Sequence, residues 1–315
     1  MSRPEILQMG SYPAWDQEPL EEAFTVRRYF EADDKQAFLA EHGPNIRGIA
    51  SRGELGASRA IIEACPNLEI VSVYGVGYDA VDLAACRERG IRVTNTPDVL
   101  TDDVADLAVA MMLARARGVV GAEHWVTSGN WAAKGAYPLQ KKVTGRRAGV
   151  LGLGRIGMGV AKRLEGFGMQ ISYSARSPKE GAEAYTYIPD AVELARNSDF
   201  FFVTLAASAE TRHIVNSDVI EALGPEGMII NVSRAANIDE TALLDALEKK
   251  TLGFAALDVF EGEPKIDPRF LALDNVLLQP HQGSGTLDTR KAMGQLVRDN
   301  LTAHFSGKPL LTPVI

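Results

Sequence analysis

Short apolar runs alternate with segments of helical periodicity along most of the chain. The most apolar runs lack the alternation of a half-exposed strand, which is typical of strands buried on both faces of a parallel sheet. These runs are residues 68–73, 199–205, 228–232 and 253–258. Strands that alternate with helices predict an α/β fold built on a doubly wound parallel sheet.

Weaker patterns complete the prediction. We expect further strands at residues 5–9, 24–26, 46–50, 91–95, 148–151, 170–173 and 275–278. Apolar spacing of three and four residues predicts helices over residues 60–65, 100–118 and 289–305. Residues 121–143 contain Trp125, Trp131 and Tyr137 but little periodicity, so we expect an arm or an irregular segment there, whose aromatic side chains pack within the chain or across a subunit contact.

A glycine-rich loop at residues 147–168, RAGVLGLGRIGMGVAKRLEGFG, organises the second half of the chain. An apolar strand enters it, Gly152, Gly154 and Gly157 follow at G-x-G-x-x-G spacing, and a helical pattern leaves it. The first glycine permits the tight turn, the second lets a diphosphate approach the backbone, and the third lets helix and strand pack closely. The loop predicts dinucleotide binding, and a tight turn without a ligand is the alternative.

The position of this loop predicts two domains. About 150 residues of α/β pattern precede it, so a smaller unit comes before the dinucleotide-binding domain. We expect the last helix to return to that first unit, which gives a discontinuous substrate-binding domain at 1–98 and 287–315 and a dinucleotide-binding domain at 99–286. A cleft between two such domains is the expected ligand site.

Composition narrows the functional class. The 315 residues are 46% hydrophobic, with a net charge of -8, which argues against nucleic acid or an acidic membrane as the main partner. No apolar run approaches the roughly 18 residues of a membrane span, and the N-terminus lacks a signal-peptide pattern. Cys65 and Cys86 have no metal-ligand spacing, so we expect buried free thiols in a reducing cytoplasm and no metal site.

Three titratable side chains follow predicted strands, where α/β enzymes place their chemistry: Arg234, Glu263 and His281. Arg can hold a carboxylate through two parallel hydrogen bonds, and His can move a proton near neutral pH. A carboxylate beside a His fixes its tautomer and favours the imidazolium. Taken singly, each of the three has an ordinary structural explanation.

With these residues in place, the chain resembles the D-isomer-specific 2-hydroxyacid dehydrogenases over nearly its whole length. The matching motifs, in the family's order, are YGVGYDAVD (74–82), TPDVLTDDVADLA (96–108), GLGRIG (152–157), NVSRA (231–235), DVFEGEP (258–264) and QPHQGSGT (279–286). The PHQGSGT form and SYSARS (172–177) are most similar to the glyoxylate/hydroxypyruvate and hydroxyphenylpyruvate reductase branch.

The resemblance implies a Rossmann-type cofactor domain, a flavodoxin-like substrate domain and a homodimer. It also implies a role for each matching residue. His281 matches the acid/base, Glu263 its paired carboxylate, and Arg234 the residue that holds the substrate carboxylate and carbonyl oxygen. The remaining matches are the substrate-binding amides of Val76 and Gly77, the cofactor loop residues Gly152, Gly154, Arg155, Ile156 and Gly157, and Asp258, which orients the nicotinamide carboxamide.

The residues after the strand at 170–173 bear on the choice of cofactor. NAD-preferring members of such folds place an acidic residue about 20 positions past the loop, where it binds the ribose 2′-hydroxyl. Here that position is Ala175, and Ser174, Arg176 and Ser177 could bind a 2′-phosphate. We therefore predict NADPH in preference to NADH, with a merely solvated Arg176 as the alternative.

Substrate choice is less constrained by the sequence. Arg52 ends a predicted strand and either faces the substrate or points to solvent, while Trp131 or Tyr137 could close the pocket of a neighbouring subunit. Small polar 2-oxo acids, glyoxylate and hydroxypyruvate, are the first expectation, with phenylpyruvate or its hydroxylated form as the alternative.

Three rivals stay open. A dinucleotide-sensing corepressor occurs in one branch of the superfamily, but this chain lacks the long disordered extension expected there. A formate dehydrogenase pairs its histidine with Gln rather than with Glu263. An NAD-linked phosphoglycerate dehydrogenase is disfavoured by Ala175 and by the short C-terminus.

Overall fold

The computed structural model describes residues 3–315 and separates into two compact units. The first unit comprises the described residues up to Leu100 together with Ser284–Ile315, and the second is Thr101–Gly283. The first unit is thus discontinuous in sequence. The assignment of residues 1–98 and 287–315 to substrate binding, and of residues 99–286 to dinucleotide binding, stays a prediction.

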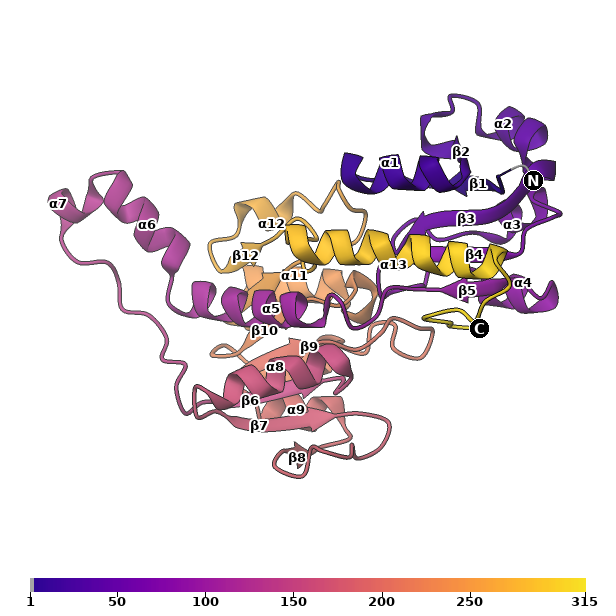
Figure 1. Cartoon of the computed structure of the whole chain (residues 1–315). Helices are drawn as coiled ribbons and strands as arrows, with labels where there is room; N and C mark the ends of the chain where they lie inside the picture. The colour runs from indigo at the N-terminus through magenta and orange to yellow at the C-terminus, as the bar shows by residue number, and fades with distance from the viewer. Residues whose placement is uncertain (1–2) are drawn as a thin grey trace. The chain divides into compact units, whose positions relative to one another are not determined.

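The first unit is built on a parallel five-stranded sheet with the order β2-β1-β3-β4-β5 (Figure 1). This is the strand order of flavodoxin-like folds, as predicted. Its strands are β1 (Glu5–Gln8), β2 (Thr25–Arg28), β3 (Ile46–Arg52), β4 (Ile70–Tyr74) and β5 (Arg92–Thr94). Its helices are α1 (Ala14–Ala23), α2 (Lys35–His42), α3 (Arg59–Ala64), α4 (Leu83–Glu88) and α13 (Leu287–Phe305), with short 3₁₀ turns η1 (Tyr29–Glu31) and η2 (Gly43–Asn45).

Apolar residues of β1, β3 and β4 form the core of this unit, because parallel strands covered by helices are buried on both faces. Cys65 and Cys86 are free and fully buried in it, as predicted. Burial raises the pKa of each thiol to about 11. Both side chains therefore act as small apolar core residues rather than as nucleophiles.

The second unit contains a parallel seven-stranded sheet with the order β12-β11-β10-β9-β6-β7-β8. The chain starts at β6, moves outward through β7 and β8, and then returns to build β9 to β12 on the other side of β6. This reversal is the Rossmann arrangement that the glycine loop predicted. The strands are β6 (Arg147–Leu151), β7 (Gln170–Ser174), β8 (Thr186–Tyr187), β9 (Phe200–Val203), β10 (Met228–Asn231), β11 (Phe254–Leu257) and β12 (Val276–Leu278).

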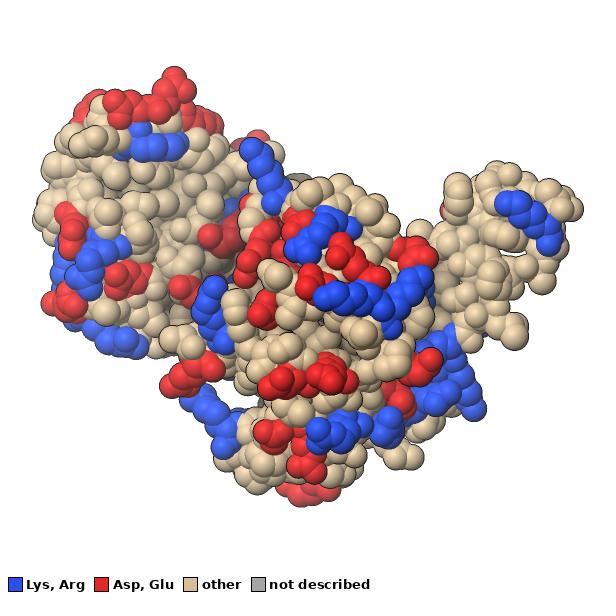
Figure 2. Space-filling model, turned by 180° about the vertical axis from the view of Figure 1, so that it is seen from behind, with Lys and Arg blue, Asp and Glu red and all other residues tan. Residues whose placement is uncertain are grey.

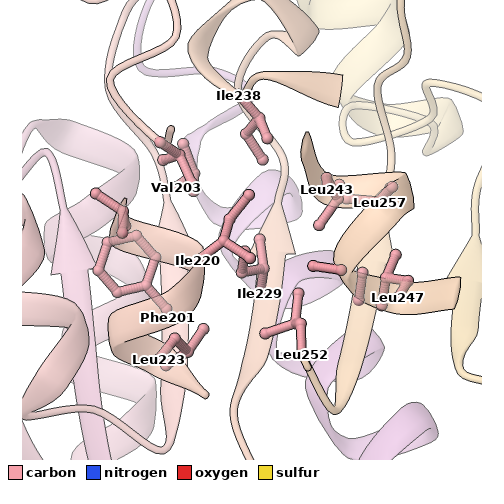
Figure 3. Packing of buried hydrophobic residues seen from close by; sticks show 14 of the residues in the cluster. Phe201, Val203, Ile220, Leu223, Ile229, Ile238, Leu243, Leu247, Leu252 and Leu257 are labelled. Atoms are coloured by element: carbon pink, nitrogen blue, oxygen red, sulfur yellow. The ribbon is translucent and has the colours of Figure 1, made fainter. Parts of the chain in front are cut away.

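Helices cover both faces of this sheet. On one face α5 (Thr101–Ala116) packs against α8 (Arg155–Glu165) and against β10 and β11. On the other face, the apolar side chains of β9 and β10 meet those of three helices (Figure 3). These helices are α9 (Ala191–Arg196), α10 (Ser217–Leu223) and α11 (Glu240–Glu248); the unit also contains η3 (Ala235–Asn237) and α12 (Arg269–Ala272). Phe200, Phe201 and Phe202 are fully buried, because β9 lies in the middle of the sheet.

Residues 119–134 differ from the expectation of irregular backbone. They form two helices, α6 (Val119–Thr127) and α7 (Asn130–Lys134), which extend away from α5 and from the sheet of this unit (Figure 1). Neither helix has a buried residue in this chain. With nine and five residues, the two helices are too short to show a sustained apolar period in the sequence.

Charged side chains of both signs are interspersed over the face of the molecule that Figure 2 shows. The net charge of -8 is therefore a poor guide to the potential at any one site. Individual residues at the strand ends decide what each site can bind.

Candidate active site

The glycine loop has the strand, turn and helix that the sequence predicted. Gly152 follows β6 with φ of 99°, and a Cβ there would lie 2.7 Å from the backbone nitrogen of Leu205. A Cβ on Gly157 would lie 2.2 Å from the carbonyl oxygen of Gly152. The first glycine therefore permits the turn and the third permits close packing of α8 on β6.

Gly154 differs from its two neighbours. A Cβ built there would have no other atom within 4 Å, so this position faces open space. Gly154 is also the N-cap of α8, and Arg155 and Ile156 form the first turn of that helix. The amino end of an eleven-residue helix next to open space suits the diphosphate of a dinucleotide, because the amides of a helix's first turn and the helix dipole both favour an anion. The residues present therefore fit such a cofactor.

The segment after β7 carries the residues predicted to choose between cofactors. Arg176 and Ser177 are exposed, and Ala175 occupies the position where an acidic residue would exclude a 2′-phosphate. Ser174 is buried, and its hydroxyl donates a hydrogen bond to the carbonyl of Pro189 at 2.9 Å. The exposed residues Arg176 and Ser177 are therefore better placed than Ser174 to meet a ligand.

His281 and Glu263 lie side by side in the second unit. Nδ1 of His281 is 2.7 Å from Oε2 of Glu263, and the two residues follow β12 and β11, which are neighbours in the sheet. His281 has φ of 51°, a left-handed conformation that is uncommon for a residue with a side chain and recurs at functional sites. Although burial opposes it, the hydrogen bonds from His281 and from the Phe260 amide lower the pKa of Glu263. Glu263 is therefore an ionised partner for the imidazole near neutral pH.

Asp258 holds the segment that follows His281. Its carboxylate is buried, and its two oxygens accept hydrogen bonds from the backbone amides of Gln282 and Gly283, each at 2.8 Å. Burial raises the pKa of Asp258, against the effect of these two amides and of His281. From the sequence, Asp258 was expected only to orient the nicotinamide carboxamide. Its hydrogen bonds to the segment after His281 were not foreseen.

Arg234 follows β10, between the glycine loop and β11 in the sheet. The side chain of Asn231 shapes this turn by donating to the Arg234 carbonyl at 3.1 Å and accepting from the Ser233 amide at 3.0 Å. The positive charge of Arg234 contributes to the lowered pKa of Glu263. The second unit thus brings Arg234, Glu263 and His281 together at one edge of its sheet.

The first unit positions the other predicted site residues by itself. Val76 and Gly77 follow β4, and the side chain of Asn95 donates to the Val76 carbonyl at 2.9 Å. Gly75 is held by Thr96, whose hydroxyl accepts from the Gly75 amide at 3.0 Å and whose amide donates to the Gly75 carbonyl at 2.9 Å. The matching motif TPDVLTDDVADLA begins at Thr96, one residue after Asn95, so the part of Asn95 in shaping this loop was not foreseen.

Arg52 ends β3 and lies opposite Tyr74 in the parallel register. Its Nε is 2.7 Å from Oε1 of Glu54, in a half-exposed ion pair. The guanidinium is therefore engaged by Glu54. A substrate carboxylate would have to compete with that carboxylate for it. Its role in substrate binding stays a prediction.

Among residues 3–315, no group of three or more His, Cys, Asp or Glu residues is arranged to hold a metal ion. In the same part of the chain, no helix is both long and apolar enough to cross a membrane.

Comparison with known proteins gives a consistent family. Hydroxyphenylpyruvate reductase from Plectranthus scutellarioides is 47% identical over 310 residues, which is 98% of this chain and 98% of the relative. A solved 2-hydroxyacid dehydrogenase from Ketogulonicigenium vulgare Y25 is 73% identical with a TM-score of 0.94, over 100% of this chain and 99% of the other. The NADPH-dependent glyoxylate/hydroxypyruvate reductase of Sinorhizobium meliloti, solved with NADP and malonate, is 43% identical with a TM-score of 0.92, over 99% and 97% of the two chains.

The second unit also matches a family model directly. Residues 109–283 match the D-isomer specific 2-hydroxyacid dehydrogenase, NAD binding domain, and this range contains the glycine loop and the paired Glu263 and His281. The chain therefore belongs to the D-isomer specific 2-hydroxyacid dehydrogenase family, and it is an oxidoreductase of that family.

Proposed function

We propose that the protein is an NADPH-dependent reductase of small 2-oxo acids. It reduces hydroxypyruvate to the corresponding D-2-hydroxy acid and glyoxylate to glycolate, which is achiral. The observation that carries this proposal is the 2.7 Å contact between His281 and Glu263, in the same unit as the glycine loop. The relative from Sinorhizobium meliloti, an NADPH-dependent enzyme of this kind, supports it. In this proposal residues 99–286 bind the dinucleotide, and residues 1–98 and 287–315 bind the substrate.

The proposed roles follow from the orientation of the imidazole. Because Nδ1 of His281 faces Glu263, its Nε2 is the atom left to give a proton to the substrate's carbonyl oxygen. Arg234 stabilises the negative charge that develops on that oxygen and holds the carboxylate. The amides of Val76 and Gly77 receive the same carboxylate. When bound, the nicotinamide supplies the hydride, and Asp258 orients its carboxamide.

Cofactor choice rests on the segment after β7. Ala175 carries no charge to repel a 2′-phosphate, and Arg176 and Ser177 are exposed next to it. We expect Arg176→Ala to raise the KM for NADPH by about tenfold and to leave the KM for NADH nearly unchanged, because only NADPH carries the extra charge. An unchanged KM for NADPH would show that Arg176 is a solvated charge.

A second candidate function is the reduction of an aromatic 2-oxo acid. The specific observation in its favour is the 47% identity to hydroxyphenylpyruvate reductase. Steady-state oxidation of NADPH and NADH should be measured with glyoxylate, hydroxypyruvate, pyruvate, phenylpyruvate and hydroxyphenylpyruvate. Higher kcat/KM for the two small acids supports the main proposal, and higher kcat/KM for the aromatic acids supports the second. Absence of turnover with every acid would favour a dinucleotide-sensing corepressor.

We also propose a homodimer. The support is the apolar surface of residues 119–139, where five large side chains are between 53% and 100% exposed: Val119, Val120, Val126, Trp131 and Leu139. Exposed apolar side chains gathered on one projecting element are typical of a subunit contact. Light scattering on the purified chain should give twice the 34.0 kDa monomer mass, and Val120→Asp should shift it toward the monomer. A monomeric wild-type protein would exclude this assembly.

We further propose a cytoplasmic location. Two free, buried thiols suit a reducing compartment. Fractionation of the producing cells tests this, and recovery of the protein in a membrane-enclosed compartment would contradict it.

A further inference from the structure

The loop that follows β7 is tied down at both of its ends by tyrosine hydroxyls. Tyr187 donates a hydrogen bond from its hydroxyl to the carbonyl of Ala175 at 3.0 Å. The hydroxyl of Tyr173 accepts one from the backbone amide of Lys179, also at 3.0 Å. The three residues between these two anchors, Arg176 to Pro178, are exposed. A five-residue loop is thus closed by one donor and one acceptor from a pair of aromatic side chains.

The two tyrosines form one structural unit. They are direct partners in the parallel register of β7 and β8, and their ring centroids are 5.4 Å apart at an interplanar angle of 49°. Tyr173 is 2% exposed, and its carbonyl accepts a hydrogen bond from the Ile188 amide at 2.8 Å. The strand β8 has only two residues, and one of them is Tyr187. This short edge strand therefore carries the side chain that reaches the loop.

The affinity of Arg176 and Ser177 for a ligand depends on how well their loop is held in place. An exposed loop that is free to move must be ordered when a ligand binds, which costs conformational entropy and weakens binding. A loop anchored at both ends is already ordered, so it loses less conformational entropy when a ligand binds. Because Arg176 and Ser177 lie between the anchors, their backbone positions are set before any ligand arrives.

We propose that Tyr173 and Tyr187 are positioning residues for recognition of a 2′-phosphorylated adenosine by the Ala175–Lys179 loop. The proposal rests on the proposed function in taking NADPH as the cofactor. It adds that selectivity depends on two hydroxyl groups that do not themselves meet the phosphate. Lys179, whose amide is one of the anchors and whose side chain is exposed, brings a second positive charge to the same loop.

The test compares two nucleotides that differ only in the 2′-phosphate, namely adenosine 2′,5′-bisphosphate and 5′-AMP. Their dissociation constants are measured by calorimetry on the full chain for wild type, Tyr173→Phe and Tyr187→Phe. Tyr185→Phe is the matched control, because it also removes a tyrosine hydroxyl close to β8, but that hydroxyl donates to Glu165 rather than to the loop. Thermal unfolding of each variant confirms that it folds.

We expect each loop variant to bind the bisphosphate about 3- to 10-fold more weakly, the size of one net hydrogen bond, with 5′-AMP binding unchanged. The control variant should bind both nucleotides as wild type does. Equal losses for both nucleotides, or no loss for either, would overturn the positioning role while leaving the preference for NADPH intact. If wild type binds the two nucleotides equally, the preference for NADPH fails and the inference fails with it.

Discussion

Glu263 contacts His281 with one carboxylate oxygen and its own loop with the other. Oε2 lies 2.7 Å from Nδ1 of His281, and Oε1 accepts a hydrogen bond from the Phe260 amide at 2.7 Å. The carboxylate is therefore held in place by the backbone and presents a fixed negative charge to the imidazole. Because Nδ1 faces Glu263, Nε2 of His281 is the ring nitrogen that can face a substrate. Replacing one residue at a time can therefore distinguish the proton donor from the group that holds it in place.

Replacing His281 with Ala should remove the proton donor while leaving the glycine loop intact. We expect kcat to fall by about 100- to 10,000-fold, the usual contribution of a positioned general acid, with little change in the Kd for NADPH. Glu263→Gln should lower kcat less, because the imidazole stays but loses its charged partner. Stopped-flow turnover and fluorescence titration of NADPH separate these effects. His42→Ala, at a histidine on α2 that the site does not use, is the control and should keep wild-type turnover.

The lowered pKa of Glu263 makes a signed prediction about stability. A carboxyl group whose pKa is lower in the folded chain than its ordinary 4.5 stabilises the fold fully above that ordinary value. This stabilisation is lost as pH falls through the lower value of the folded state. The difference in free energy of unfolding between wild type and Glu263→Gln should therefore shrink as pH falls below about 4.5. Urea unfolding on both sides of that pH tests it, and a difference that grows as pH falls below that value would contradict the assignment.

The glycines of the loop should respond differently to the same substitution. Gly154→Ala should fold with near wild-type stability, because the added methyl group faces open space. It should nevertheless weaken dinucleotide binding, since the methyl group occupies the approach to the backbone. Gly157→Ala should destabilise the protein, because its Cβ would lie 2.2 Å from the Gly152 carbonyl oxygen. Thermal unfolding with and without NADPH separates the two, and equal stabilities of the two variants would show that the helix can shift to relieve the clash.

Asn95 should matter for substrate rather than for cofactor. Its side-chain amide donates to the Val76 carbonyl, so Asn95→Asp removes the donor at nearly unchanged shape. We expect a several-fold higher KM for the 2-oxo acid, with the Kd for NADPH unchanged, because the loop at Val76 and Gly77 becomes less well held. Asn67→Asp is the matched control, since Asn67 likewise donates to a backbone carbonyl, that of Pro44, but on an exposed turn. If both variants raise the KM equally, the effect comes from the added charge and not from the loop.

The local elements were largely predictable because their signals are local. The apolar run at 199–205 predicted the buried strand β9, although the strand, Phe200–Val203, is shorter than the run. Residues 100–118 predicted α5, and the spacing of Gly152, Gly154 and Gly157 predicted the turn from β6 into α8. The helices α6 and α7 were missed because nine and five residues are too few to show a sustained apolar period.

Sequence alone determined the chemical types of the site residues and their places after strands, because parallel strands bring their carboxyl ends to one edge of a sheet. Residue patterns alone could not determine which side chains meet across that edge, although the family resemblance implied the pairing of His281 with Glu263. The anchoring of Gln282 and Gly283 by Asp258, and the two tyrosine hydroxyls that hold the Ala175–Lys179 loop, were not foreseen, and all of these contacts join strands or loops to one another. Such contacts depend on strand order and register, which arise only when the whole sheet packs, because a hydrogen bond needs its two partners within about 3 Å of each other.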